Sequence, residues 1–116
     1  MSQATQMTTD MRQCIQNCTE CQATCVETMA HCLKIGGPHA EAAHIGSLLD
    51  CAQLCAASSD FMLRQSSLHR NTCSACADAC RVCAESCEQM GAGDEVMKRC
   101  AELCRRCEES CRKMAG

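Results

Sequence analysis

The segment CIQNCTECQATC, residues 14–25, places cysteines at intervals of four, three and four residues. The same spacing returns in CADACRVCAESC at 76–87 and in CAELCRRCEESC at 100–111. Alternating intervals of three and four are typical of one face of an α-helix, because a helical turn contains about 3.6 residues. Zinc ribbons and small disulfide-bonded proteins have no need of this phase. The spacing therefore predicts helices whose inward faces are lined with cysteine.

Breaks in this pattern divide the chain of 116 residues into four helical segments. The sequence Gly36-Gly37-Pro38 ends the first segment, because glycine accommodates a helix C-terminus and proline does not continue a helix. We expect helices from about Thr9 to Lys34, from near Pro38 to about Gln65, from an N-cap at Asn71 or Thr72 to just before Gly91, and from an N-cap at Asp94 to about Met114. Such helices, joined by short loops, predict an all-α, up-down-up-down four-helix bundle with a cysteine-lined core, in a single domain over residues 1–116.

The composition leaves this bundle short of ordinary core side chains. Sixteen of the 116 residues are cysteine, and the single aromatic residue is Phe61. Cysteines in place of leucine-sized residues leave cavities, each of which destabilises a core when it stays empty. Something must therefore fill the space, and thiols at this density indicate metal.

Charge, hydropathy and the N-terminal residues exclude several classes of partner and compartment. The net charge of −3 provides no basic surface for nucleic acid, and no apolar run is long enough to span a membrane. Residues 1–14, MSQATQMTTDMRQC, lack the charged and apolar regions of a secretory signal. We therefore expect a cytoplasmic protein, and in a reducing compartment such a cysteine content favours metal binding over disulfides.

The donor atoms favour Cu(I) as the bound ion. Thiols four residues apart stand on adjacent turns of one helix face, so their sulfur atoms can share an ion. Sulfur ligands select soft ions, above all Cu(I), which accepts two or three sulfurs, whereas zinc prefers a closed set of four ligands. Loading approaches ~16 Cu(I) per chain if each thiolate bridges two ions, and ~8 if thiolates are unshared.

A thiol-rich redox buffer and another soft-metal protein, binding zinc or an iron–sulfur cluster, stay open as alternatives. Cys18 and Cys21 have the C-x-x-C spacing of redox proteins, but they lie mid-helix on the inward face. Glu41 and His44 form one E-x-x-H pair, although a di-iron bundle needs two. The sequence contains no Ser-His-Asp set or glycine-rich phosphate loop, so we expect no enzyme activity.

The cysteine pattern resembles that of the bacterial four-helix-bundle copper storage proteins, in particular their cytosolic branch. The resemblance covers essentially the whole chain and rests on C-x3-C-x2-C-x3-C in three of the four predicted helices. It implies a homotetramer that stores many Cu(I) ions along each core, with copper donor and acceptor unidentified. The predicted second helix departs from the pattern, since Ser58 and Met62 follow Cys51 and Cys55 in phase. The metal ligands that the resemblance implies are Cys14, Cys18, Cys21, Cys25, Cys32, Cys51, Cys55, Cys73, Cys76, Cys80, Cys83, Cys87, Cys100, Cys104, Cys107 and Cys111, together with Met62, His69 and Met114 near one mouth.

The predicted topology gives the bundle two mouths, one at each end. One mouth groups Met7, Met11, Met62, His69, Cys73 and Met114. The other groups Met29, His31, Cys32, His39, His44, Met90 and Met97. Methionines at a mouth either pass Cu(I) inward through weak thioether sites or fill gaps in the core, and both interpretations stay open. Metal binding by His31, His39 or His44 is also left open.

The predicted second helix carries a further apolar stripe, about a quarter-turn from its cysteine face. The stripe consists of Ala42, Ile45, Leu49, Ala52, Ala56 and Leu63. An apolar stripe of this length indicates either a contact between subunits or sideways packing inside the bundle.

Overall fold

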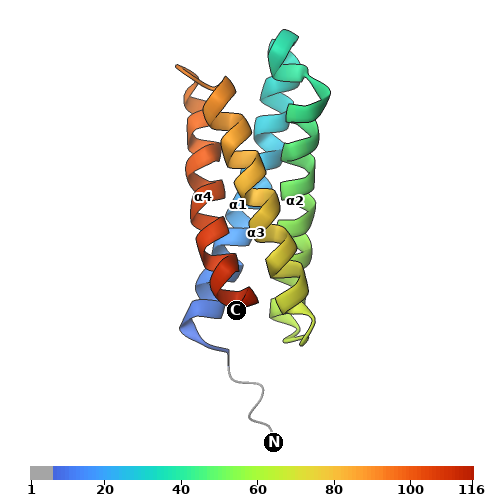
Figure 1. The fold of residues 1–116 in the computed structure, drawn as a ribbon, viewed down its shortest axis with the longest axis vertical. Coiled ribbons are helices and arrows are strands. Elements are labelled where there is room, and N and C mark those ends of the chain that lie inside the picture. Colours follow the sequence, from blue (N-terminus) through green and yellow to red (C-terminus); the bar gives the residue numbers. More distant parts are fainter. Residues whose placement is uncertain (1–6) are drawn as a thin grey trace, which may run out of the picture.

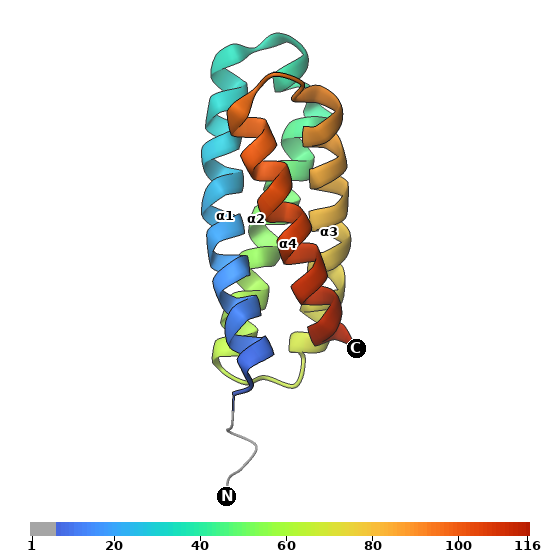
Figure 2. The ribbon, with the colours of Figure 1, turned by 90° about the vertical axis from the view of Figure 1, so that its left-hand side faces the viewer.

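The computed structural model describes residues 7–116 and confirms an all-α four-helix bundle (Figure 1). Its elements are α1 (Thr9–Ile35), the short 3-10 helix η2 (Gly37–Ala40), α2 (Ala42–Leu63), α3 (His69–Met90) and α4 (Glu95–Ala115). Successive long helices run in opposite directions, so the α1–α2 and α3–α4 connections share one end of the bundle (Figure 2). The α2–α3 connection and the C terminus lie at the other end. Within the described residues, no helix has the length and apolar character needed to cross a membrane.

Helices α1 and α4 begin where the sequence predicts. The Thr8 hydroxyl accepts a hydrogen bond from the Met11 amide at 3.1 Å, and the Asp94 carboxylate accepts one from the Met97 amide at 3.0 Å. Both side chains satisfy amides that the first helical turn leaves unpaired. Gly36 follows α1 with a φ of 75°, a left-handed value that glycine adopts without strain.

The second helix starts later and ends earlier than predicted. Pro38 lies in η2, and Glu41, which is extended with a ψ of 141°, separates η2 from α2. The helix therefore starts at Ala42, and it ends at Leu63 because Gln65 has a φ of 57°, outside the right-handed helical region. Proline fixes its own φ but not the backbone after it, so Pro38 marked the connection without marking the start of the long helix.

The predicted N-cap of the third helix is wrong. Asn71 and Thr72 lie inside α3, which starts at His69, and the Thr72 hydroxyl donates to the His69 carbonyl at 3.1 Å. Ser66 closes the preceding turn by accepting a hydrogen bond from the Leu68 amide at 3.2 Å. Serine and threonine side chains bond to the backbone in turns and inside helices as well as at caps, so their presence did not fix the boundary.

The second apolar stripe divides between the interior and the surface. Ala52 is buried, and Ile45 packs against the core, so sideways packing accounts for these two residues. The members that stay exposed recur every seven residues, and they are Ala42, Leu49, Ala56 and Leu63. A role for this exposed row in subunit contact remains a prediction.

Candidate metal centre

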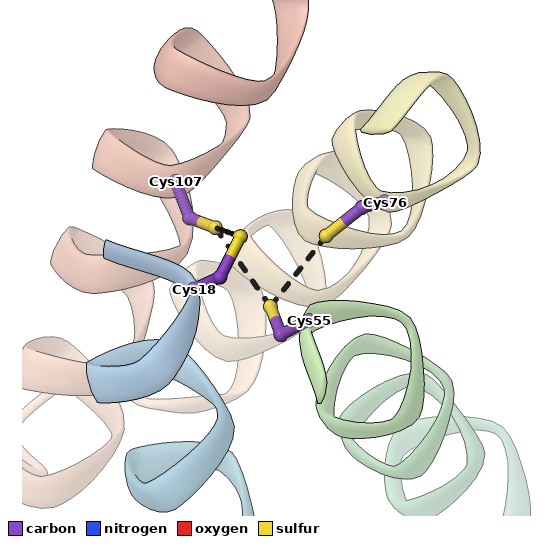
Figure 3. Close-up of side chains that lie close together, drawn as sticks. All are labelled: Cys18, Cys55, Cys76 and Cys107. Atoms are coloured by element: carbon purple, nitrogen blue, oxygen red, sulfur yellow. Dashed lines mark hydrogen bonds between the residues drawn. The ribbon is translucent and has the colours of Figure 1, made fainter. Parts of the chain in front are cut away.

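All sixteen cysteines are buried free thiols inside the bundle. The spacing of three and four residues gives each long helix one cysteine face, and the antiparallel packing turns the four faces toward a common axis. Sulfur atoms from different helices approach closely, to 3.6 Å for Cys18 with Cys107 and for Cys55 with Cys76 (Figure 3). The prediction of a cysteine-lined core is therefore confirmed.

The central part of the core contains four groups of four cysteines, each with all its sulfur atoms within 4.8 Å of one another. Around a tetrahedral ion with metal–sulfur bonds of about 2.3 Å, ligand sulfurs lie about 3.8 Å apart, close to the observed contacts. The groups are Cys18/Cys55/Cys76/Cys107, Cys21/Cys25/Cys51/Cys104, Cys21/Cys51/Cys55/Cys80 and Cys25/Cys83/Cys100/Cys104.

These four groups share members. Cys21, Cys25, Cys51, Cys55 and Cys104 each belong to two groups, so at most two of the four groups can be occupied without sharing a thiolate. An ion that requires four unshared thiolates therefore leaves half of the groups unused. The continuous sulfur column suits an ion that accepts bridging thiolates and two or three sulfur ligands, which is the preference of Cu(I).

One end of the column, the Met62 end, comprises Cys14, Cys73, Cys111 and Met62. The three cysteines form a close sulfur group, with 3.7 Å between the Cys14 and Cys111 sulfurs. Met62 is fully buried, as is Ser58, whose hydroxyl has no hydrogen-bond partner among the described residues. This end therefore offers three thiols in a closed, mainly sulfur environment.

The three predicted ligands other than cysteine differ in position. Met62 lies in the core, and Met114 is half-buried against it. His69 is half-buried one turn before Cys73 on α3, and its Nδ1 lies 2.8 Å from the Ser66 carbonyl oxygen. His69 belongs to none of the close ligand groups formed by residues 7–116. Metal binding by these three side chains remains a prediction.

The opposite end, the His44 end, brings Cys32, His44 and Met97 together. The Cys32 sulfur lies 3.4 Å from His44 Nε2 and 3.3 Å from Met97 Sδ. His44 is only 2% exposed, and its Nδ1 lies 2.7 Å from the Ser86 hydroxyl oxygen. If Nδ1–H donates to Ser86, the Nε2 lone pair faces Cys32. A thiol, an imidazole and a thioether then converge on one point.

The protonation states at the His44 end suit metal binding. Burial lowers the pKa of His44, and nearby His39 acts in the same direction, so the imidazole is neutral near pH 7 and keeps a lone pair for an ion. Burial raises the pKa of Cys32 to about 11, and the charge of Asp94 adds to the rise. The empty site therefore holds a neutral thiol, and an incoming ion must displace its proton.

The sequence placed His44 at this mouth without showing that it joins a cysteine. The available signal is its phase, since His44 precedes Cys51 by seven residues and so shares the cysteine face of α2. His31 and His39 lie elsewhere, with Nε2 atoms 2.8 and 3.8 Å from the Asp94 carboxylate. The phase thus predicts that His44 faces the core, and tertiary packing shows that it meets Cys32.

The fold and the thiol column define a class of protein, the cysteine-lined four-helix bundles that hold soft metal ions in their core. Residues 7–116 match the family described as Copper storage protein, Csp. This match extends over nearly the whole chain, and the protein belongs to the copper storage protein family. No curated protein sequence matches the chain significantly.

Solved structures with the same fold include copper-loaded proteins. The Nmul_A1745 protein from Nitrosospira multiformis is 42% identical, with 91% of this chain and 94% of that chain covered and a TM-score of 0.86. The Cu(I)-bound copper storage protein BsCsp3, from Bacillus subtilis, is 29% identical over 92% of this chain and 99% of that chain, with a TM-score of 0.85. The copper storage protein Ccsp from Streptomyces lividans, loaded with 10 copper equivalents, is 26% identical over 98% and 90%, with a TM-score of 0.86.

Proposed function

We propose that this protein stores Cu(I) in the cytosol and that its cysteine column is the store. The overlap of the four-sulfur groups carries the proposal, because shared thiolates allow about one ion per cysteine. At that ratio each Cu(I) balances one thiolate, and the loaded core is electrically neutral. The capacity then approaches ~16 Cu(I) per chain, with release of the thiol protons on loading.

All sixteen cysteines act as ligands in this proposal, and the two ends add other donors. His44 and Met97 complete a terminal site with Cys32. His44 Nε2 and Met97 Sδ lie 3.4 and 3.3 Å from the Cys32 sulfur. At the Met62 end, the weaker donors Met62, His69 and Met114 lie beside the column. Thioethers bind Cu(I) without carrying charge, which suits transient binding.

Storage accounts for the core better than a redox or catalytic role. The C-x-x-C pair of a redox protein must meet its partner at the surface, but Cys18 and Cys21 have no exposed surface. The E-x-x-H pair does not form an inward carboxylate–imidazole site, since Glu41 is exposed and His44 faces Cys32. We propose no catalytic residue and no enzyme activity.

The assembly and partners are also part of the proposal. We propose a homotetramer in which the exposed row on α2, centred on Leu49 and Ala56, contributes to subunit contact. Copper ions are the cargo, and the net charge of −3 offers no surface for nucleic acid. A single bundle domain carries the whole function.

Anaerobic titration of the reduced protein with Cu(I), in competition with a Cu(I) chelator, tests the proposal. We expect saturation near ~16 Cu(I) per chain, whereas Zn(II) should stop near ~2 because only two four-sulfur groups avoid sharing a thiolate. Saturation at about four Cu(I) or fewer, or a clear preference for Zn(II), overturns it, because a bridged column would then not form.

A further inference from the structure

The least deeply buried cysteines lie on the flank of the bundle between α3 and α4, near the His44 end. Cys14, Cys73 and Cys111 at the Met62 end and Cys32 at the His44 end have no exposed surface. Among all sixteen cysteines, only Cys87 and Cys100 have any, at 1% each. The cover over the sulfur column is therefore thinnest at the side, between α3 and α4.

A groove of about 560 Å³ lies over this point, and we call it the Cys87 groove. Its lining includes Cys87, Glu88 and Gly91 from the end of α3 and Lys98, Glu102 and Arg105 from α4. This volume is within the range of small-molecule sites. Figure 2 shows the α3–α4 connection that borders it.

Cys87 connects the groove with the column. Cys87 follows Cys83 by one helical turn on α3, and Cys83 belongs to a four-sulfur group with Cys25, Cys100 and Cys104. The Cys100 sulfur lies 3.9 Å from that of Cys25 on α1. Cys87 itself belongs to none of the close groups in residues 7–116, so it is an outer thiol next to a complete site.

The rim of the groove carries one free charge of each sign. Arg105 and Glu88 neutralise each other through a two-point ion pair, with N–O distances of 2.9 and 3.1 Å. Lys98 and Glu102 are exposed and form no ion pair with any residue of the described range. A ligand that carries both a carboxylate and an ammonium group complements this pair.

We propose that the Cys87 groove is a lateral Cu(I)-exchange port for a low-molecular-weight thiol with an amino-acid end. The inference rests on the proposed storage function and adds the route and the kind of carrier. The carrier's carboxylate binds Lys98, its ammonium group binds Glu102, and its sulfur approaches Cys87.

Exchange at this port is a ligand substitution in which copper remains Cu(I). In loading, the Cys87 sulfur bonds to copper held by the carrier thiolate, and the bond from copper to the carrier sulfur breaks. The Cys87 proton passes to the departing thiolate, which leaves as the free thiol. Unloading is the reverse reaction, and no electron is transferred in either direction.

Limited alkylation of the reduced, metal-free protein tests the access route directly. With a small amount of iodoacetamide and peptide mapping by mass spectrometry, we expect Cys87 to be labelled first. First labelling at any other thiol, including the end thiols Cys14, Cys32, Cys73 and Cys111, overturns the port. This measurement uses the unaltered chain and so does not depend on the folding of a variant.

Stopped-flow loading from a Cu(I)–glutathione complex tests the function of the port. Cys87→Ser should slow the initial rate by about tenfold, while Ser74→Ala, at an exposed position near the other end of α3, should leave it nearly unchanged. Equal rates for the two variants overturn the proposal. Each variant is first compared with the parent by circular dichroism and by its final Cu(I) capacity.

Charge reversal on the rim tests the carrier class. Lys98→Glu should slow loading from Cu(I)–glutathione by about tenfold, with little effect when neutral 2-mercaptoethanol is the carrier. Lys113→Glu makes the same charge change on α4 outside the groove and should affect neither carrier. Equal slowing by both lysine variants overturns recognition at the groove. Normal capacity with unaltered rates refutes only the port, whereas a low capacity in the parent protein refutes storage itself.

Discussion

The two ends of the sulfur column close it with different chemistry. At the Met62 end, three thiols lie within 4.8 Å of one another beside a fully buried thioether. At the His44 end, a single thiol, Cys32, faces an imidazole and a thioether at 3.4 and 3.3 Å. In the proposed store, the first set would bind an ion through several negative charges, and the second would do so through one charge and two neutral donors. The ends should therefore differ in affinity and in how many ions depend on each cysteine.

The difference also shows how each end is held in place. In the metal-free protein Met62 fills space, and its contribution to stability is that of an apolar side chain in a packed core. His44 is held by a directed contact, because Ser86 fixes the position of Nδ1 and so the direction in which Nε2 points. Substitutions at the Met62 end should therefore mainly weaken packing. Substitutions at the His44 end should mainly disturb the orientation of the His44 ring.

Met62→Ala should have the largest effect on the metal-free protein. Removing a fully buried thioether side chain leaves a cavity, and we expect a loss of about 2–5 kcal/mol in the free energy of unfolding. Urea denaturation under reducing conditions measures it. Met114→Ala, at a half-buried position of the same end, is the matched control and should cost less than half as much. Similar losses in the two variants contradict the role assigned to Met62 in packing.

Loss of a cysteine should cost more copper at the Met62 end than at the His44 end. The Cys111 sulfur lies 3.7 Å from Cys14, 3.6 Å from Cys18 and 3.9 Å from Cys107, whereas Cys32 belongs to none of the close cysteine groups of residues 7–116. Cys111→Ser should reduce the capacity by about two Cu(I), and Cys32→Ser by about one, because bridging thiolates serve two ions. Chelator competition measures both. Equal losses show that the ends are equivalent.

Ser86→Ala should weaken the His44 end without opening a large cavity. The imidazole Nδ1 loses its partner at 2.7 Å in a buried position, which costs about 1–3 kcal/mol of stability. The copper ion bound at Cys32 should also become weaker, because the ring is free to turn. Ser86→Thr retains the hydroxyl and should restore both properties. NMR of the His44 ring nitrogens reports the tautomer, and an unaltered ring signal in Ser86→Ala contradicts the positioning role.

Alkaline pH should destabilise the metal-free protein from both ends. The pKa of Cys73 rises to about 12, since the effects of Cys14 and burial outweigh the lowering by the Cys111 hydrogen bond, and that of Cys32 rises to about 11. The unfolded chain ionises these thiols first, near pH 9, so stability falls as the pH increases from about 9 toward 12. Each thiol contributes a slope of at most about 1.4 kcal/mol per pH unit.

Urea denaturation at a series of pH values measures this slope. Cys32→Ala and Cys73→Ala should each make it less steep, and the double variant should do so additively because the two thiols lie at opposite ends. A stability that is constant from pH 8 to pH 11 contradicts burial of neutral thiols at the ends.

Leu49→Glu should leave both ends unchanged. Leu49 is 42% exposed on the outer face of α2, so a charge there should dissociate an oligomer while the Cu(I) capacity per chain stays the same. Sedimentation of the parent protein and the variant provides the comparison, and Gln53→Glu, at another exposed position of α2, is the control. If the parent protein is monomeric at micromolar concentration, the exposed row of α2 is not a subunit contact.

The fold was largely predictable from the sequence because a single physical signal dominates it. Cysteine intervals of three and four fix the inward face of each helix, and Gly36, Pro38 and Gly91 divide the helices. Boundaries without a decisive residue were less predictable. The N-cap expected at Asn71 or Thr72 was wrong because several hydroxyl side chains near the turn can bond to the backbone equally well.

The sequence by itself determined which residues face the axis, that their donors are soft, and hence the kind of ion that the core holds. Only the tertiary structure decided which sulfurs meet, because contacts between helices depend on their relative rotation and axial offset, which periodicity along one helix does not contain. It brought His44 to Cys32, divided the apolar row of α2 between interior and surface, and placed Cys87 beneath a groove. These features arise where two helices from distant parts of the chain meet, and there packing, rather than local sequence, sets the distance between atoms.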